Sequence, residues 1–248
     1  MTILERLLAL GENGERAVLF TMLDGETAGA KLLALESGET IGDAPPELAA
    51  HTGELLRRGR NRLLELDGGR VFCEVYGPPP RLAVYGAVDT AESLCRAAKL
   101  LGWTTIVADA RAKFATAERI PSADELVVDW PEEAFGRIAP DHATAVVVLT
   151  HDDKFDVPAL KAALASEAFY IGALGSRRNQ ERRRERLLEA GVEEDALARI
   201  AGPCGLDIGA DSNEETAVSI LAEALAARAG REGGPLRESK QRIHVEVN

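Results

Sequence analysis

The sequence predicts an α/β protein with two domains: a small α+β domain over residues 1–78, then a Rossmann-like domain over residues 81–230, a parallel sheet with helices on both faces. Three observations predict this class. After residue 80, short apolar segments alternate with segments of helical period, as in successive β-α-β units. Before residue 78, turn pairs such as Asp24-Gly25 separate the apolar segments closely enough for hairpins. Between the halves stands Pro78-Pro79-Pro80, which cannot donate ladder hydrogen bonds and therefore marks a domain boundary.

In the first domain, apolar patterning and turn residues define the elements. Segments 16–23, 31–36, 63–66 and 71–76 are predicted to be strands, and segments 4–10 and 47–58 helices. Gly11 is expected to end the first helix. Asp67-Gly68-Gly69 is a good hairpin signal, because aspartate and glycine tolerate the positive φ angles of tight turns. The strands are therefore expected to pair antiparallel.

In the second domain, strands and helices alternate along the chain. The expected strands are 82–85, 105–108, 125–128, 145–149 and 169–174; the expected helices are 88–101, a segment from about Pro131, 157–164, 180–190, 193–200 and a last helix after Ser212. Ser212 and Glu215 form a capping-box pattern at the start of that last helix. Residues 231–248 are expected to be a polar tail.

Composition narrows the classes of function. The net charge of -12 argues against a nucleic-acid-binding protein, because neutralising phosphates requires a basic face. Cys73, Cys95 and Cys204 are odd in number and show no paired spacing, so they predict neither a disulfide framework nor a zinc site and suit a reducing cytoplasm. No apolar run approaches the roughly 20 residues of a membrane span, and no apolar signal core is present at the N-terminus. We therefore expect a cytoplasmic protein without a membrane span.

The candidate ligand-binding residues lie where the predicted parallel strands end. Ligands of such sheets bind outside the carboxyl ends of the strands. Four segments fall there, and a glycine-dense loop is expected to join them; the segments are 86–91, 109–114, 150–156 and 172–178, and the loop is 205–211.

The first of these segments occupies the place of the dinucleotide fingerprint G-x-G-x-x-G/A. Gly86 and Ala91 satisfy its first and last positions, but Val88 stands at the second glycine, where it crowds the approach to a pyrophosphate. Ordinary NAD binding is therefore disfavoured. Asp109 can still accept a hydrogen bond from a ribose hydroxyl; the alternative is a structural turn with a solvated aspartate at the strand end.

The strongest local case for an anion site is Gly175-Ser176-Arg177-Arg178. An apolar strand ends there and a helix begins, so free backbone N–H groups and two guanidinium groups face the space beyond the strand. The alternative is a helix start whose arginines only pair with Glu181 and Glu185.

His151 and Asp152 follow the most apolar strand. They are candidates for a proton-transfer pair or part of a metal site, or else belong to a solvated loop. Cys204, between Pro203 and Gly205, is expected to display its thiol and is a candidate ligand for a soft metal; the alternative is a small packed hydrophobic side chain.

Several motifs, taken in order, resemble the XdhC/CoxI family. They are RLAVYGA (81–87), DAR (109–111), VDWP (128–131), LTHD (149–152), YIGALGSRR (170–178), GLDIGA (205–210) and the helix from Glu214. The resemblance covers the second domain nearly end to end and the first domain more weakly. The chain departs from many relatives at Gly86-Ala87-Val88-Asp89, where they have a Gly-Ala-Gly-His type turn, and at Cys73-Glu74-Val75, where they have Cys-Gly-Gly.

The resemblance implies a chaperone that binds the molybdenum cofactor, protects it during sulfuration and helps load it into a molybdenum hydroxylase, of the xanthine dehydrogenase or carbon monoxide dehydrogenase type. It implies a non-catalytic role, a client enzyme and a cofactor sulfurase as candidate partners, with a homodimer left open. The phosphate of molybdopterin is assigned to the 175–178 segment, and its heterocycle to strand-end amides, Asp109 or Asp207. The complete set of candidate cofactor-binding residues is Gly86, Asp109, His151, Asp152, Gly175, Ser176, Arg177, Arg178, Gly205 and Asp207.

Two other functions remain open from the sequence. An NAD(P)-dependent oxidoreductase is suggested by the Rossmann pattern and Asp109, although Val88 and the lack of a catalytic tyrosine-lysine or histidine-carboxylate set argue against it. A nucleotide-sensing module that regulates a partner through its first domain is the third.

Overall fold

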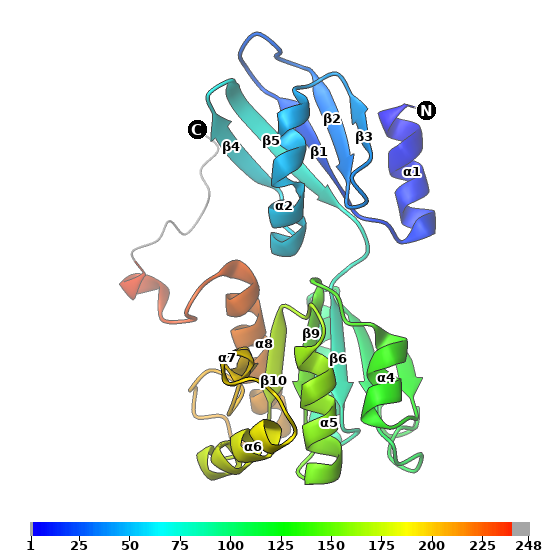
Figure 1. Cartoon of the computed structure of the whole chain (residues 1–248), viewed down its shortest axis with the longest axis vertical. Coiled ribbons are helices and arrows are strands. Elements are labelled where there is room, and N and C mark those ends of the chain that lie inside the picture. The colour runs from blue at the N-terminus through cyan, green and yellow to red at the C-terminus, as the bar shows by residue number, and fades with distance from the viewer. Residues whose placement is uncertain (1, 240–248) are drawn as a thin grey trace. The chain divides into compact units, whose positions relative to one another are not determined.

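The computed structural model describes residues 2–239 of the 248-residue chain. These residues divide into two compact units: residues 2–78 together with 234–239, and residues 79–233 (Figure 1). Part of the predicted tail therefore groups with the N-terminal unit, while its positions 240–248 lie outside the described residues. Among the described helices, none combines the length and apolar character needed to cross a bilayer.

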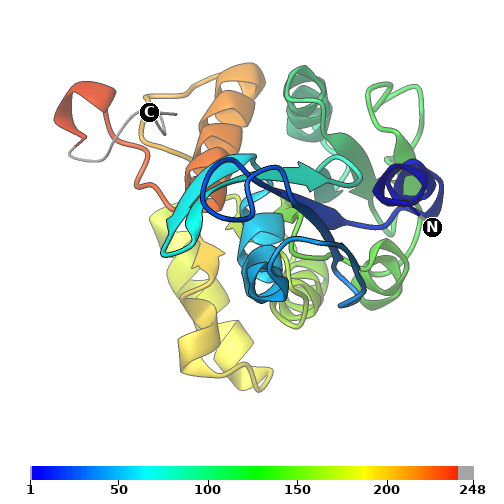
Figure 2. The same cartoon turned by 90° about the horizontal axis from the view of Figure 1, so that it is seen from above.

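The N-terminal unit is an antiparallel sheet with a helix packed on each face. Its strands have the order β3-β2-β1-β5-β4. They are β1 (Ala17–Met22), β2 (Lys31–Leu35), β3 (Thr40–Gly42), β4 (Arg62–Leu66) and β5 (Gly69–Tyr76), and the helices are α1 (Ile3–Asn13), the 3-10 turn η1 (Pro46–His51) and α2 (Thr52–Arg58). Alternate β1 residues pack on opposite sides, Val18 and Phe20 with α2 and η1, and Ala17 and Leu19 with α1. In Figure 2, α1 lies next to the N label and α2 apart from it.

The four predicted strands of this unit are confirmed, whereas the short strand β3 was not predicted. The first helix does not end at Gly11. It continues to Asn13, because Gly14, in the left-handed conformation, ends it. At its start, Thr2 and Glu5 form a capping box.

The C-terminal unit is a parallel sheet of Rossmann type with the strand order β11-β10-β9-β6-β7-β8. Its strands are β6 (Arg81–Tyr85), β7 (Thr104–Ala108), β8 (Glu125–Val127), β9 (Thr144–Val148), β10 (Tyr170–Ala173) and β11 (Ile200–Ala201). Its helices are α3 (Asp89–Leu100), α4 (Pro131–Ile138), α5 (Asp153–Leu164), α6 (Arg177–Glu189), α7 (Glu194–Leu197) and α8 (Asn213–Ala229). The order reverses between β6 and β9, and ligands of doubly wound sheets bind at this kind of switch point.

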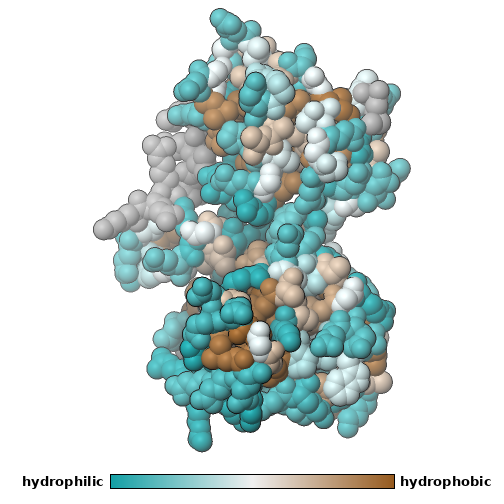
Figure 3. Space-filling model, in the orientation of Figure 1, coloured by the Kyte–Doolittle hydropathy of each residue, from teal (hydrophilic) through white to brown (hydrophobic). Residues whose placement is uncertain are grey.

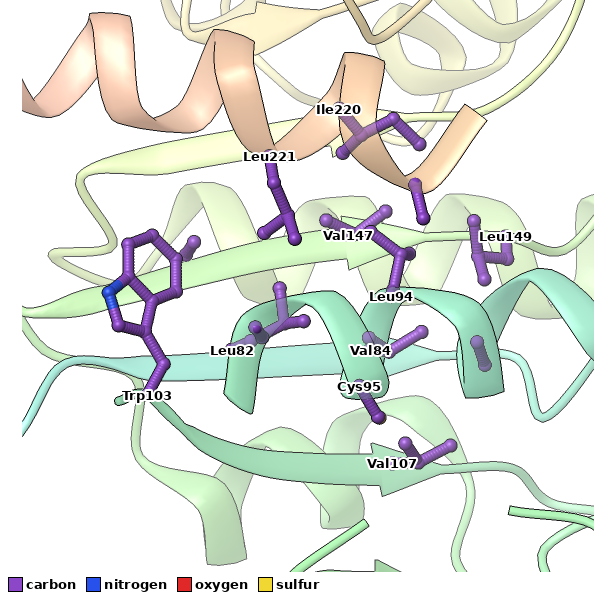
Figure 4. Close-up of a cluster of buried hydrophobic side chains, with 14 of the residues drawn as sticks. Leu82, Val84, Leu94, Cys95, Trp103, Val107, Val147, Leu149, Ile220 and Leu221 are labelled. Atoms are coloured by element: carbon purple, nitrogen blue, oxygen red, sulfur yellow. The ribbon is translucent and has the colours of Figure 1, made fainter. Parts of the chain in front are cut away.

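Helices cover both faces of this sheet, which explains why its strands are apolar throughout. On one face α3 and α8 pack on alternate strand residues such as Leu82 and Val84, and Figure 4 shows Leu94 of α3 and Ile220 of α8 in this cluster. On the other face α4, α5 and α6 pack on the intervening residues, including Tyr85. Full burial of both faces removes the polar–apolar alternation of a half-exposed sheet.

Three helix boundaries differ from the prediction. Helix α5 begins at Asp153 and not at 157, because Asp152 caps it. A start at 157 would place Pro158 in the first turn, where proline is common, but Pro158 lies further inside the helix. Helix α6 begins at Arg177, because Ser176 caps it. The helix expected over 193–200 is the single turn α7, and Ile200 leaves it to form β11 beside β10.

Candidate functional site

The predicted strand-end segments meet at one edge of the C-terminal sheet, the lower edge in Figure 1. Backbone hydrogen bonds tie residues in or next to four of these segments to the neighbouring strand: Gly86 N–H to Ala108 O (2.8 Å), Leu149 N–H to Tyr85 O (2.9 Å), Leu174 N–H to Val148 O (3.0 Å) and Cys204 N–H to Ala173 O (3.1 Å). The surface along this edge is mostly hydrophilic in Figure 3. The sheet therefore brings together the segments that the sequence predicts for ligand binding.

The turn after β6 is shaped by Gly86. Its φ is +114°, and a Cβ there would lie 3.2 Å from Thr150 Cγ2 and 3.3 Å from the Leu149 backbone, so a larger residue would push β9 away. Val88 occupies the N-cap position of α3 and packs partly against the core. A branched side chain thus stands where a dinucleotide fingerprint has its second glycine.

Asp109, at the end of β7, is turned inward. The residue is only 1% exposed; Oδ2 accepts from Ala87 N–H (2.9 Å), and Arg111 donates from both Nε and Nη2 at 2.8 Å. Burial opposes ionisation of Asp109, but the hydrogen bonds from Arg111 and Ala87 outweigh it and hold the pKa of Asp109 below its usual value. Of this pair, Arg111 is the partly exposed member. A direct contact between Asp109 and a cofactor stays a prediction.

We expect the Asp109→Asn variant to be less stable than the parent chain by about 1–3 kcal/mol at pH 7. The pKa of Asp109 is lower in the folded state than the roughly 3.9 of an unfolded chain. Its stabilisation is therefore fully present above about pH 4 and is lost as the pH falls through the folded pKa. Urea unfolding at pH 7 and pH 3 checks this, because the difference between parent and variant should shrink at pH 3. An equal difference at both pH values would contradict the assignment, and Asp89→Asn, which removes an exposed carboxylate, serves as the control.

The start of α6 presents the arginines predicted to hold an anion. Gly175 has a φ of +142°, and Ser176 Oγ accepts from Asn179 N–H (3.3 Å) as the N-cap. Arg177 and Arg178 are exposed, and within residues 2–239 no ion pair joins either of them to Glu181, Glu185 or another carboxylate. The next arginines of the helix all have partners: Arg182 with Asp153, Arg183 with Asp156, Arg184 with Glu194 and Arg186 with Glu189.

Behind this helix start lies a buried ion pair that the sequence did not reveal. Arg183 and Asp156 are 5% and 4% exposed, with Arg183 Nε 2.6 Å from Asp156 Oδ2. The remaining groups are also used: Thr150 Oγ1 donates to Asp156 Oδ1 (3.0 Å), and Arg183 donates to Leu174 O (3.0 Å) and Gln180 Oε1 (2.6 Å). The pair therefore joins the ends of β9 and β10 to α5 and α6.

Glu223 of α8 holds the 205–211 loop, which follows β11, through a hydrogen bond to the backbone of Gly205. A single oxygen, Oε2, accepts from Tyr170 Oη (2.5 Å) and from Gly205 N–H (2.7 Å). Gly205 has a φ of +108°, and a Cβ there would lie far inside van der Waals contact with Ser219 Oγ. Asp207, further along the loop, is exposed.

Cys204 is packed and not displayed. Its side chain is half-buried against the core under α3 and α8, and burial, with the nearby Glu223, raises the pKa of its thiol to about 12. The thiolate needed to bind a soft metal is therefore disfavoured. Across residues 2–239 no cluster of three His, Cys, Asp or Glu side chains is arranged to hold a metal ion.

His151 and Asp152 lie at the edge but do not form a pair. Both are exposed, and Asp152 caps α5 by accepting from Lys154 N–H (3.2 Å). Lys154 Nζ also lies 3.4 Å from Asp152 Oδ2. The structure thus gives Asp152 a capping role, while a cofactor contact of either residue stays a prediction.

A cluster of cations around one aromatic ring is a candidate site that the sequence did not reveal. Arg111, Lys113 and Arg119 surround the ring of Phe114, with 4.2, 5.1 and 4.9 Å between each charged group and the ring centroid. The only signal in the sequence is the run of basic residues that follows the strand-end aspartate. This signal is weak because Arg119 lies eight positions beyond Arg111 and only the fold brings it back.

Comparison with known proteins finds a matching family model and several similar sequences. The model described as the XdhC Rossmann domain matches residues 82–224. An uncharacterized protein, YqeB, of Escherichia coli K12 is 31% identical over 207 residues, covering 80% of this chain and 37% of its own length. A protein of Bacillus subtilis 168, described as a probable subunit of xanthine dehydrogenase, is 32% identical, covering 64% of this chain and 46% of its own. The molybdenum cofactor insertion chaperone PaoD of Escherichia coli K12 is 29% identical, covering 63% and 43%.

A solved structure extends the likeness to both units. A crystal structure described as a xanthine dehydrogenase from Bacillus halodurans aligns with 92% of this chain and 65% of its own, at 26% identity and a TM-score of 0.67. The chain spans less than half the length of the curated relatives named above.

Proposed function

The chain belongs to the XdhC family, and from this premise we propose that it binds the molybdenum cofactor and helps to insert it into a client enzyme. The client is a molybdenum hydroxylase of the xanthine dehydrogenase or carbon monoxide dehydrogenase type. The observation that carries the proposal is the match of the XdhC Rossmann domain over residues 82–224, and the relative named as a molybdenum cofactor insertion chaperone supports it. In this proposal the cofactor is cargo and the role of the chain is non-catalytic.

The start of α6 is the part of the edge that suits the cofactor's phosphate. The first N–H groups of a helix have no partner within the helix. Ser176 Oγ accepts from Asn179 N–H, and within residues 2–239 the N–H groups of Arg177 and Arg178 have no hydrogen-bond partner. Both guanidinium groups are exposed and without ion-pair partners within residues 2–239. A phosphate there would gain charge-assisted hydrogen bonds and would relieve two positive charges at the positive end of the helix dipole.

The other candidate residues would border the bound cofactor. The Gly86 turn, the Gly205 loop and Asp207 lie along the same edge, with Asp109 behind it, so strand-end amides and Asp207 are the groups proposed to contact the heterocycle. The proposed partners are the client enzyme and a cofactor sulfurase, with self-association as a further proposal.

We expect the double variant Arg177→Ala/Arg178→Ala to bind the cofactor about 10 to 100 times more weakly than the parent chain, because two charge-assisted contacts are lost. The measurement is an anaerobic fluorescence titration of the full chain with cofactor released from a molybdenum enzyme. The matched control is Arg184→Ala/Arg186→Ala, which removes the same charge from the same helix and should change affinity less than about threefold.

Two outcomes would contradict the proposal. Absence of binding to the parent chain would remove the direct-binding function. Equal affinity of the parent and the Arg177→Ala/Arg178→Ala variant would show that the cofactor's phosphate does not bind at the start of α6.

An NAD(P)-dependent oxidoreductase is the second candidate, favoured by the Rossmann strand order. Val88, the N-cap residue of α3, opposes it, because a branched residue there replaces the glycine that lets the backbone approach a pyrophosphate. Dehydrogenase turnover with a nicotinamide cofactor would reverse this ranking.

A further inference from the structure

The carboxyl end of β7 carries a group of cations that the proposed function does not use. We call Arg111, Lys113, Phe114 and Arg119 the Phe114 cluster. Its three charged groups all lie within 5.1 Å of the ring centroid of Phe114, on a chain whose net charge is -12. Contact with the ring face offsets part of the mutual repulsion of the three cations, and an anion bound among them would offset the rest.

Arg111 is held in place ready to bind. Its Nε and Nη2 both donate to the buried carboxylate of Asp109, which fixes the plane of the guanidinium. No hydrogen bond within residues 2–239 uses its Nη1, and the side chain is 38% exposed. The guanidinium group of Arg111 is therefore held in orientation by Asp109 while its Nη1 donors stay free. Because the side chain is already ordered, little conformational entropy would be lost when it binds an anion.

Lys113 and Arg119 add charge that is not neutralised by a buried partner. Both are exposed, and Lys113 has no ion pair within residues 2–239. Arg119 reaches Asp89 at 3.4 Å, but Asp89 is 82% exposed, so this ion pair is weak and easily exchanged. A phosphate can therefore replace Asp89 as the partner of Arg119.

The position in the fold identifies the kind of anion. The end of the second strand of a Rossmann unit is where the adenosine ribose of a dinucleotide lies; an acidic residue there accepts from the 2′-hydroxyl, and an arginine nearby accommodates a 2′-phosphate. Here the acidic residue, Asp109, is 1% exposed and both of its oxygens already accept hydrogen bonds from Ala87 or Arg111, so it is a poorer acceptor for a ribose hydroxyl than a free carboxylate. The polar groups of the Phe114 cluster itself, on Arg111, Lys113 and Arg119, are donors only.

We infer that the Phe114 cluster is a subsite for a ribose 2′-phosphate monoester, as in the adenosine half of a phosphorylated nicotinamide nucleotide. The inference goes beyond cofactor insertion and does not depend on it. Because Val88 replaces the fingerprint glycine that favours binding of the adjoining pyrophosphate, we expect the 2′-phosphate and not the diphosphate to supply most of the binding energy. The subsite lies at β7, whereas the proposed cofactor phosphate lies at α6 beyond β10, and in the sheet order β9 and β6 separate these strands.

The test is isothermal titration calorimetry of the full chain with adenosine 2′-monophosphate and with adenosine 5′-monophosphate. The two ligands have the same base, sugar and charge and differ only in the position of the phosphate. We expect the 2′-isomer to bind at least about ten times more tightly. Equal affinities, or no binding of the 2′-isomer at millimolar concentration, would overturn the inference.

Three variants locate the site. Lys113→Ala/Arg119→Ala should weaken binding of the 2′-isomer at least about tenfold, and because both side chains are exposed the variant should keep its thermal midpoint. Arg96→Ala removes an exposed guanidinium from the middle of α3 and should leave the affinity unchanged. Arg177→Ala/Arg178→Ala should also leave it unchanged.

Loss of binding in the α6 variant with retention in the β7 variant would overturn the inference, since the nucleotide would then occupy the proposed cofactor site. The two proposals can therefore be refuted independently. Absence of cofactor binding would not affect the 2′-phosphate inference, and absence of 2′-phosphate binding would not affect the cofactor proposal.

Discussion

Replacing Arg183 by methionine should lower the free energy of unfolding of the C-terminal unit by about 3–5 kcal/mol, because the carboxylate of Asp156 would be left buried without its cation. Leu174 O and Gln180 Oε1 would lose their donor as well. Urea unfolding followed by tryptophan fluorescence measures this unit alone, since the chain's two tryptophans, Trp103 and Trp130, both belong to it.

Two companion variants make the result interpretable. Arg182→Ala removes an exposed arginine from the same helix, together with its ion pair to Asp153, and should cost less than about 1 kcal/mol. Asp156→Leu/Arg183→Met should recover most of the loss, because no charge then remains buried. If Arg183→Met were no more costly than Arg182→Ala, the pair would not be buried as described.

Replacing Gly205 by alanine should destabilise the C-terminal unit by about 2–6 kcal/mol. A φ of +108° is strained for any residue with a Cβ, which contributes about 1–3 kcal/mol, and the overlap with Ser219 adds about 1–3 kcal/mol. The same tryptophan-monitored unfolding measures the loss.

Gly209 provides a control within the same loop. Its φ is +72°, in the left-handed region, and a Cβ there would meet nothing within 4 Å. Gly209→Ala should therefore cost only about 1–2 kcal/mol, the backbone strain without the overlap. Equal losses in the two variants would show that contact with Ser219 does not decide the effect.

The architecture of the C-terminal unit could be predicted from the sequence because its signals are local. Apolar strands and helical periods follow each other along residues 81–174, and strand ends of a parallel sheet meet at one edge whatever the details of the loops. The strand β11 escaped prediction because its two residues carry no pattern of their own. It forms because Ile200 and Ala201 come to lie beside Ile171 and Gly172.

The roles of individual charged residues depend on contacts between distant parts of the chain. Arg183 belongs to a helix whose alternating charges indicate a solvated surface, yet it pairs with Asp156, which is 27 positions away, in the interior. The strand-end position of Asp109 predicts a free acceptor, but its orientation is set by Arg111 and by the amide of Ala87. The place of Cys204 between proline and glycine predicts a displayed thiol, although the core beneath the loop takes up its side chain.

The two hydrogen bonds that share Glu223 Oε2 have a consequence for how cargo could enter and leave. The Gly205 loop cannot lift from the sheet without losing the acceptor of its own amide, and movement of α8 would also leave the buried hydroxyl of Tyr170 unpaired. This border of the site therefore behaves as a fixed wall. The side chains of Arg177 and Arg178 have no such ties, so under the proposed function a cofactor should enter and leave past these two arginines, while the Gly205 loop stays in place.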